Sequence, residues 1–147
     1  MPFKINIGTK QGKTYKLETE SEALVGKTLG EVIQGKDVSP SLDGYEFQII
    51  KTNDLSGFTA MNEVKGIGLK KVLLSYGKGM HKRPKKEGKK KRSNSTPGGL
   101  RLRKTVRGKV ISNAIVQINL KPTKEGSKKL SEIFPEQNKA EAPAESK

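Results

Sequence analysis

Apolar and polar residues alternate over several short stretches in the first half of the chain, and glycines separate these stretches. Residues 3–7 and 14–18 alternate on either side of a segment that contains two glycines, which predicts a β-hairpin. Residues 45–52 carry three large apolar residues at every second position and predict a third strand.

The same reasoning extends along the chain. Residues 26–35 (GKTLGEVIQG), bounded by glycines, predict a short strand that presents Leu29, Val32 and Ile33, and residues 70–76 predict a longer one. Residues 110–120 predict one bent strand or two paired strands. Residues 19–25 favour one or two helical turns that end at Gly26. Six or seven short strands with little helix predict a mainly β protein, a small antiparallel β-barrel, because closure removes the exposed edges of a sheet.

A single domain with appendages fits the length of 147 residues. We expect a β-barrel domain over residues 1–122, which includes a basic arm over residues 76–109 that forms a long loop. A short helix is expected within residues 123–135. Residues 136–147 hold no large apolar side chain and are expected to form a disordered tail.

The hydrophobic residues, 31% of the chain, are too few for a large core. We expect this small core to include Ile49, Leu73 and Ile118. The sequence has no run of 18 apolar residues and no apolar signal segment at its N-terminus. We therefore expect a soluble, cytoplasmic protein that does not contact a membrane.

Charge is distributed unevenly along the chain, whose net charge is +15. Residues 1–75 hold ten lysines and nine acidic residues, and residues 110–147 hold six lysines and five acidic residues. Between Tyr76 and Lys109 there are fourteen lysines and arginines, including all five arginines of the chain, and Glu87 is the one acidic residue. A patch of one sign indicates a polyanionic partner, because an ordinary soluble surface mixes both signs.

Nucleic acid is the partner that this basic arm favours. A polybasic run binds membranes firmly only with a second signal, such as a lipid anchor or an amphipathic face, and the arm has neither. Residues 77–109 contain no aromatic side chain on which a single-stranded base could stack. Contacts to the backbone and shape of folded or double-helical nucleic acid are therefore expected.

Catalytic and cofactor chemistry find no support in the sequence. The chain has no cysteine, and its single histidine, His81, lies in a basic stretch without other metal-ligand types. Residues 8–14 (GTKQGKT) have three residues between the glycines, whereas a phosphate-binding P-loop needs four. No acid, base and nucleophile are recognisable as a set. We expect no enzyme, no catalytic residue, no cofactor, no metal site and no small-molecule substrate.

A series of short motifs, in a fixed order, resembles a known family. The motifs are NDLSGF (residues 53–58), KKVLLSYG (70–77), KRP (82–84) and RKTVRG (103–108), followed by VISNAIVQINL. Together they resemble the small-subunit ribosomal protein S6e family of archaea and eukaryotes over residues 3–121. The chain departs from that pattern in reading GFTAM, where the family has Gly-Phe-Pro-Met, and in an inserted SNSTPGGLR. It also lacks the long C-terminal helix of eukaryotic members and is similar to the short archaeal form.

The resemblance implies a structural, ribosome-bound protein that binds small-subunit ribosomal RNA beside neighbouring ribosomal proteins, with its basic extension between RNA helices. The RNA-facing residues that it implies are Lys82, Arg83, Pro84, Lys89, Lys90, Lys91, Arg92, Arg103, Lys104 and Arg107. The charge of the arm adds Lys85, Lys86, Arg101 and Lys109 to the candidates. The alternative is a free-standing basic protein that packages DNA or binds nucleic acid transiently, as chromatin proteins do.

Overall fold

The structure is a computed structural model, and it describes residues 2–75, 99 and 101–137. The strands are β1 (Phe3–Gly8), β2 (Thr14–Thr19), β3 (Val32–Gln34), β4 (Glu46–Asp54), β5 (Leu69–Ser75), β6 (Arg101–Arg107) and β7 (Ile115–Lys124). The helices are short: the 3₁₀ turns η1 (Glu22–Leu24) and η2 (Pro40–Leu42), and the α-helices α1 (Gly35–Val38) and α2 (Leu130–Ile133).

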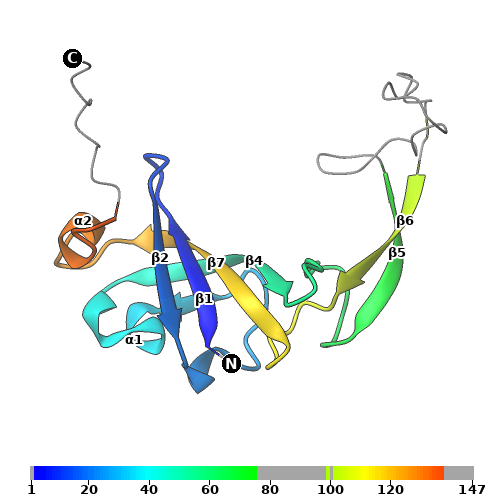
Figure 1. Cartoon of the computed structure of the whole chain (residues 1–147), viewed down its shortest axis with the longest axis horizontal. Coiled ribbons are helices and arrows are strands. Elements are labelled where there is room, and N and C mark those ends of the chain that lie inside the picture. The colour runs from blue at the N-terminus through cyan, green and yellow to red at the C-terminus, as the bar shows by residue number, and fades with distance from the viewer. Residues whose placement is uncertain (1, 76–98, 100, 138–147) are drawn as a thin grey trace, which may run out of the picture.

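Five of the strands form one sheet in the order β2-β1-β7-β4-β3, and β5 and β6 form a separate two-stranded ribbon (Figure 1). In the sheet, β1 pairs with β7 in parallel, and the other neighbours are antiparallel. The predicted hairpin of β1 and β2 is confirmed, since Phe3 pairs with Thr19 and Gly8 with Thr14.

The mainly β composition is confirmed, but the predicted barrel is wrong, because the sheet is open. The strand predicted at residues 70–76 leaves the sheet and pairs with β6, so five strands remain for the body. The edge strand β3 has only three residues. The other edge, β2, is covered at Lys16, whose backbone N–H and C=O both bond to the side-chain amide of Gln137, at 2.7 and 2.8 Å.

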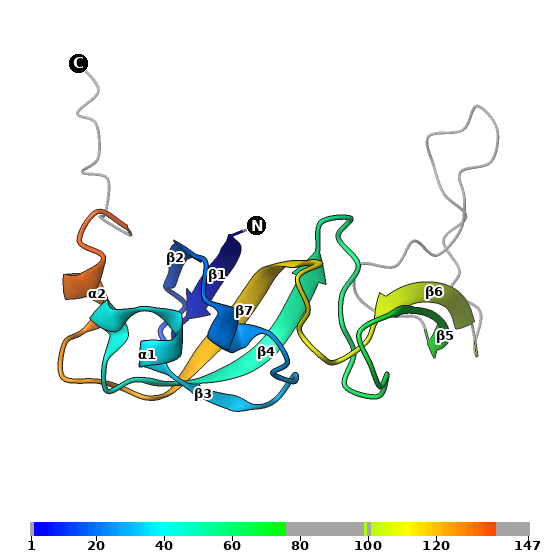
Figure 2. The same cartoon turned by 90° about the horizontal axis from the view of Figure 1, so that it is seen from below.

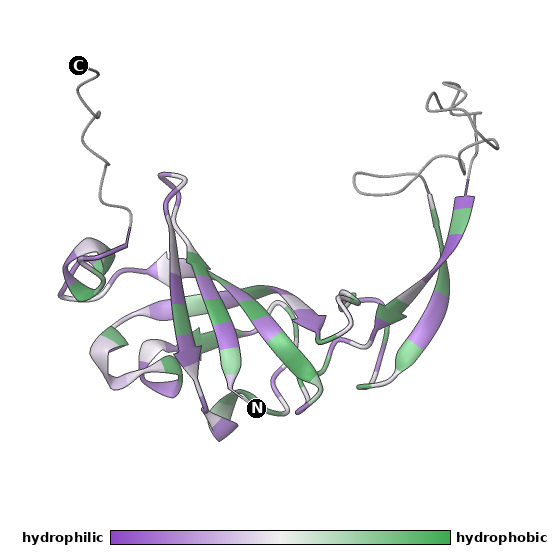
Figure 3. Ribbon diagram, viewed as in Figure 1, coloured by the Kyte–Doolittle hydropathy of each residue, from purple (hydrophilic) through white to green (hydrophobic). Residues whose placement is uncertain are grey.

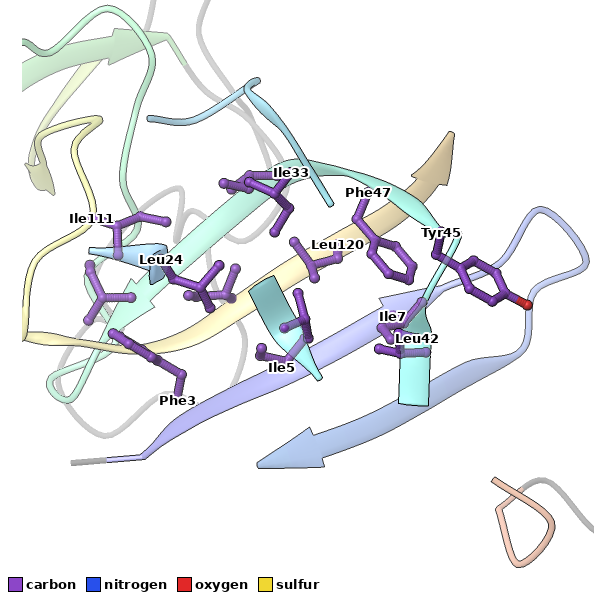
Figure 4. Packing of buried hydrophobic residues seen from close by; sticks show 14 of the residues in the cluster. Phe3, Ile5, Ile7, Leu24, Ile33, Leu42, Tyr45, Phe47, Ile111 and Leu120 are labelled. Atoms are coloured by element: carbon purple, nitrogen blue, oxygen red, sulfur yellow. The ribbon is translucent and has the colours of Figure 1, made fainter. Parts of the chain in front are cut away.

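The core lies between one face of this sheet and the short helical segments on that side (Figure 2). Hydrophobic and polar residues alternate along β1, β2 and β7 (Figure 3), because successive side chains of a strand point to opposite faces. Figure 4 shows side chains from the sheet, such as Ile5 and Leu120, pointing toward Leu24 and Leu42.

Two of the three predicted core residues are buried. Ile49 and Ile118 are 0% exposed, which confirms them. The prediction for Leu73 is wrong, since its side chain is 49% exposed. Leu73 lies in β5, and alternation within a strand does not say whether that strand packs on the core.

The helical predictions hold in outline. The turn η1 follows Ser21 and buries Leu24, and α2 forms within residues 123–135 and buries Leu130. Residues 110–120 contain a single strand, β7, which begins only at Ile115 after a turn closed by a hydrogen bond from its N–H to the carbonyl of Ser112, at 2.9 Å.

Candidate nucleic-acid interface

The basic arm is not one long loop, because residues 101–107 form β6, which pairs with β5 along its whole length. This corrects the loop predicted over residues 76–109. Leu102 and Val106 lie at even positions between arginines at odd positions, a period of two that is typical of a strand, but the high charge of the segment favoured a loop. The resulting ribbon extends away from the five-stranded sheet (Figure 1).

The antiparallel register sorts the ribbon's side chains into two faces, because directly paired residues lie on the same face. The first face consists of Leu69, Lys71, Leu73, Ser75, Arg101, Arg103, Thr105 and Arg107. The second face consists of Lys70, Val72, Leu74, Leu102, Lys104 and Val106. All three arginines of the ribbon therefore share one face, and the less exposed apolar residues occupy the other.

Lys71, Arg101 and Arg103 are exposed on the first face. None of them forms an ion pair with a carboxylate of residues 2–75, 99 or 101–137. A guanidinium can hold a phosphate through two parallel hydrogen bonds, whereas an ammonium acts as a point charge. This face thus combines two bidentate phosphate donors with a lysine.

Arg107 is bound within the protein. Its Nε and Nη2 lie 3.0 and 2.9 Å from Oδ2 of Asp54, and its Nη1 donates to the carbonyl of Ile67 at 3.1 Å. The Asp54 side chain is 4% exposed, and its Oδ1 accepts from the backbone N–H of Phe58 at 2.7 Å. The pair joins the end of β4 to the end of β6 and thereby anchors the ribbon to the body.

Backbone contacts reinforce this anchor. The Arg107 N–H donates to the carbonyl of Thr59, and the Arg107 carbonyl accepts from the N–H of Met61, both at 3.0 Å. The next residue must be glycine, because a Cβ on Gly108 would lie 1.9 Å from the carbonyl oxygen of Gly66. Two features of the RKTVRG motif thus have structural reasons, namely its last arginine and its glycine.

Sequence reasoning did not single out Asp54 as the partner of Arg107. Both residues lie in motifs that carry the family resemblance, NDLSGF and RKTVRG, and that coincidence was the available signal.

Lys109 also lies at the anchor, where its N–H donates to the carbonyl of Val64 at 2.8 Å. Its side chain has no ion pair with a described carboxylate.

Most of the predicted RNA-binding residues lie outside the described residues. These are Lys82, Arg83, Pro84, Lys85, Lys86, Lys89, Lys90, Lys91 and Arg92. Of the five that are described, Arg101 and Arg103 share the first ribbon face with Arg107, Lys104 lies on the second face, and Lys109 follows the ribbon.

The described residues contain no group of three His, Cys, Asp or Glu side chains that could hold a metal ion. None of the helices in that part of the chain has the length and apolar character needed to cross a membrane.

Comparison with known proteins gives consistent matches over most of the chain. The model of the family described as Ribosomal protein S6e matches residues 3–135. Three relatives carry the name small ribosomal subunit protein eS6. The protein of Methanococcus maripaludis strain C7 is 38% identical over 128 residues, which cover 86% of this chain and 91% of the relative. The protein of Archaeoglobus fulgidus is 38% identical over 138 residues, which cover 91% of this chain and 96% of the relative. The protein of Methanocaldococcus jannaschii is 38% identical over 125 residues, which cover 85% of this chain and 84% of the relative.

Proposed function

Because the chain belongs to the ribosomal protein S6e family, we propose that it is a structural protein of the small ribosomal subunit that binds small-subunit ribosomal RNA. In this role it is ribosome-bound, lies beside other ribosomal proteins, and needs no catalytic group or cofactor. The ribbon and the basic segment that joins its two strands make the principal RNA contact.

The observation that carries this proposal is the first face of the ribbon. Lys71, Arg101 and Arg103 have no carboxylate partner among the described residues, and they lie together on an element that extends from the body. Cations without a described carboxylate partner on one face of a narrow ribbon can contact the phosphates of a nucleic acid, either within a groove or along its backbone. Arg107 acts differently from these three, because its guanidinium bonds to Asp54 and holds the ribbon in place.

Two double variants with the same change in charge test whether the first face contacts RNA. Lys71→Gln/Arg103→Gln removes one cation per strand from the first face, and Lys70→Gln/Lys104→Gln does the same on the second face. Binding of each full-length variant to purified small-subunit ribosomal RNA is measured between about 50 and 200 mM salt.

We expect the first-face variant to bind more weakly than the second-face variant and to show the smaller salt dependence, because each lost phosphate contact removes about 0.9 from the slope on duplex DNA. If the two variants lose affinity equally, with no preference for RNA over duplex DNA, the ribbon attracts polyanions without docking. That result would support the alternative of a free-standing DNA-binding protein.

Sedimentation tests the ribosomal role itself. A component of the small subunit comigrates with that subunit through a gradient. It also stays bound in a high-salt wash, because salt screens exposed charge contacts but leaves buried contacts largely intact. Release of the protein by moderate salt would contradict a structural role.

A further inference from the structure

The outer face of the five-stranded sheet carries polar residues that the proposed function does not use. Its strands bury alternate residues in the core, so the residues between them point outward. Strand register arranges the outward residues in rows across β2, β1, β7 and β4. The rows are Lys16, Asn6, Asn119 and Lys51; Glu18, Lys4, Gln117 and Asn53; and, on β7 and β4, Lys121 and Gln48, and Lys124 and Glu46.

A β-bulge in β4 places Lys51 on this face. Uninterrupted alternation after Phe47 and Ile49 would turn Lys51 toward the core. Instead Ile49 pairs with Leu120 and Lys51 pairs with Asn119, the adjacent residue of β7, which leaves Ile50 as an extra residue. Ile50 and Lys51 are consequently both exposed.

The sheet face concentrates the positive charge of the body. It carries five lysines and two acidic residues, whereas the rest of residues 2–65 and 108–137 holds eight lysines and ten acidic residues. The five lysines are Lys4, Lys16, Lys51, Lys121 and Lys124. Lys4 pairs with Glu18 at 4.0 Å and Lys124 with Glu46 at 3.6 Å, and the other three have no ion pair with a described carboxylate.

An amide cluster lies at the centre of the face. Asn119 Oδ1 accepts hydrogen bonds from Asn6 Nδ2 at 3.2 Å and from Gln117 Nε2 at 3.0 Å. These bonds leave the amide nitrogen of Asn119 as a donor and the amide oxygens of Asn6 and Gln117 as acceptors, and no described group bonds to them. The cluster therefore offers donors and acceptors side by side.

Two shallow hollows adjoin the cluster. One, of about 430 Å³, includes Lys51, Asn119 and Lys121 in its lining, and the other, of about 230 Å³, includes Lys4, Lys16 and Glu18. Asn6 borders both. A ligand in the two hollows would thus contact the amides at its centre and lysines on both sides.

We propose that this sheet face is a second RNA-binding surface, which lies against the shallow minor groove of an RNA helix. That groove exposes 2′-hydroxyl groups, each both a donor and an acceptor, and a nearly flat surface can reach them. The amide cluster suits these hydroxyls. Lys16 and Lys51 lie three strand spacings apart, about 14 Å, where they can reach phosphates on either side of the groove.

The proposal rests on the proposed function, since its ligand is RNA. It uses different residues, so the sheet face can be disproved while RNA binding by the ribbon still holds. The test variant is Lys51→Gln/Lys121→Gln. Its matched control is Lys36→Gln/Lys128→Gln, which removes two exposed lysines that are not on the sheet face. The probes are purified small-subunit ribosomal RNA, an RNA duplex, and the DNA duplex of the same sequence.

We expect the test variant to reduce the salt dependence of RNA binding by about 1.8, for two lost phosphate contacts, and the control to leave it nearly unchanged. Asn119→Ala is expected to weaken binding to the RNA duplex more than to the DNA duplex, because only RNA has the 2′-hydroxyl. Equal effects of the two lysine variants would overturn the proposal, even if substitutions on the ribbon weaken binding.

Lysine acylation of the unsubstituted protein gives a second measurement that depends on no variant. RNA binding should protect Lys16, Lys51 and Lys121 and leave Lys36 and Lys128 reactive. Protection of the sheet lysines in intact small subunits, but not by RNA alone, would indicate that a neighbouring protein covers the face and would overturn the RNA assignment.

Discussion

Removal of one partner of the buried ion pair between Arg107 and Asp54 is expected to destabilise the junction of the ribbon and the body strongly. In Arg107→Met the side chain keeps its length and apolar stem, but the Asp54 carboxylate keeps only the N–H of Phe58 as a described partner. The Asp54 and Arg107 side chains are 4% and 14% exposed, so water does not replace the guanidinium fully.

Removal of one partner from such a pair typically costs about 3 to 5 kcal/mol, because it leaves an uncompensated buried charge. A domain of this size is stable by about 5 to 15 kcal/mol in total, so the loss is a large fraction. Asp54→Asn should cost less, since Arg107 retains its bond to the carbonyl of Ile67 and is the more exposed partner. The double variant should cost less than the sum of the two single variants.

Urea denaturation gives the free energies of unfolding, and Lys36→Met serves as the control. Lys36 pairs with Asp43 at 3.4 Å, but their side chains are 65% and 64% exposed, and such pairs contribute about 0 to 1 kcal/mol. If Arg107→Met costs no more than Lys36→Met, the pair does not anchor the ribbon. Hydrogen exchange of residues 101–107 adds a local measurement, in which Arg107→Met should speed exchange in β6 before it affects β1 or β7.

Three further predictions concern single residues. Gly108→Ala should destabilise the protein strongly, because its Cβ would meet the carbonyl oxygen of Gly66 at 1.9 Å, whereas Gly68→Ala meets nothing within 4 Å and should have little effect on the melting temperature. Leu73→Ala should cost much less than the roughly 2 to 5 kcal/mol expected for Ile49→Ala, since Leu73 is 49% exposed and Ile49 is fully buried; equal losses in urea denaturation would contradict the observed packing. Burial raises the pKa of the Tyr45 phenol, so the stability that depends on its neutral form is present below about pH 10 and is lost as pH rises through the raised pKa. Tyr45→Phe should therefore reduce the fall in unfolding free energy between about pH 9 and pH 11, and an unchanged fall would exclude Tyr45 as its source.

Strands and family could be predicted from this sequence because both depend on local information. Alternation placed Ile49 and Ile118 in the core, and the motif order indicated the family that the comparisons confirm. The predicted barrel, and the extension of the predicted loop over residues 101–107, were wrong for one shared reason. The partner of β5 is β6, a strand within the most charged part of the chain, and pairing removes both strands from the body.

The role of Arg107 illustrates the limit for the candidate site. By composition it is one of five arginines in a basic arm, equivalent to Arg101 and Arg103. Only the fold brings it to Asp54, 53 residues earlier, while the register leaves the other two arginines on the ribbon face without a described carboxylate partner.

The sequence alone determined the periodicities, the segregation of charge into one segment and the motifs that identify the family. The tertiary structure decided which residues share a surface. Lys16, Lys51 and Lys121 are spread over segments with little net charge, and they lie on one sheet face because β1 pairs with β7 and a bulge turns Lys51 outward. Period-two alternation fixes which side of its own strand a residue occupies, but the partner strand and the register are fixed by long-range packing.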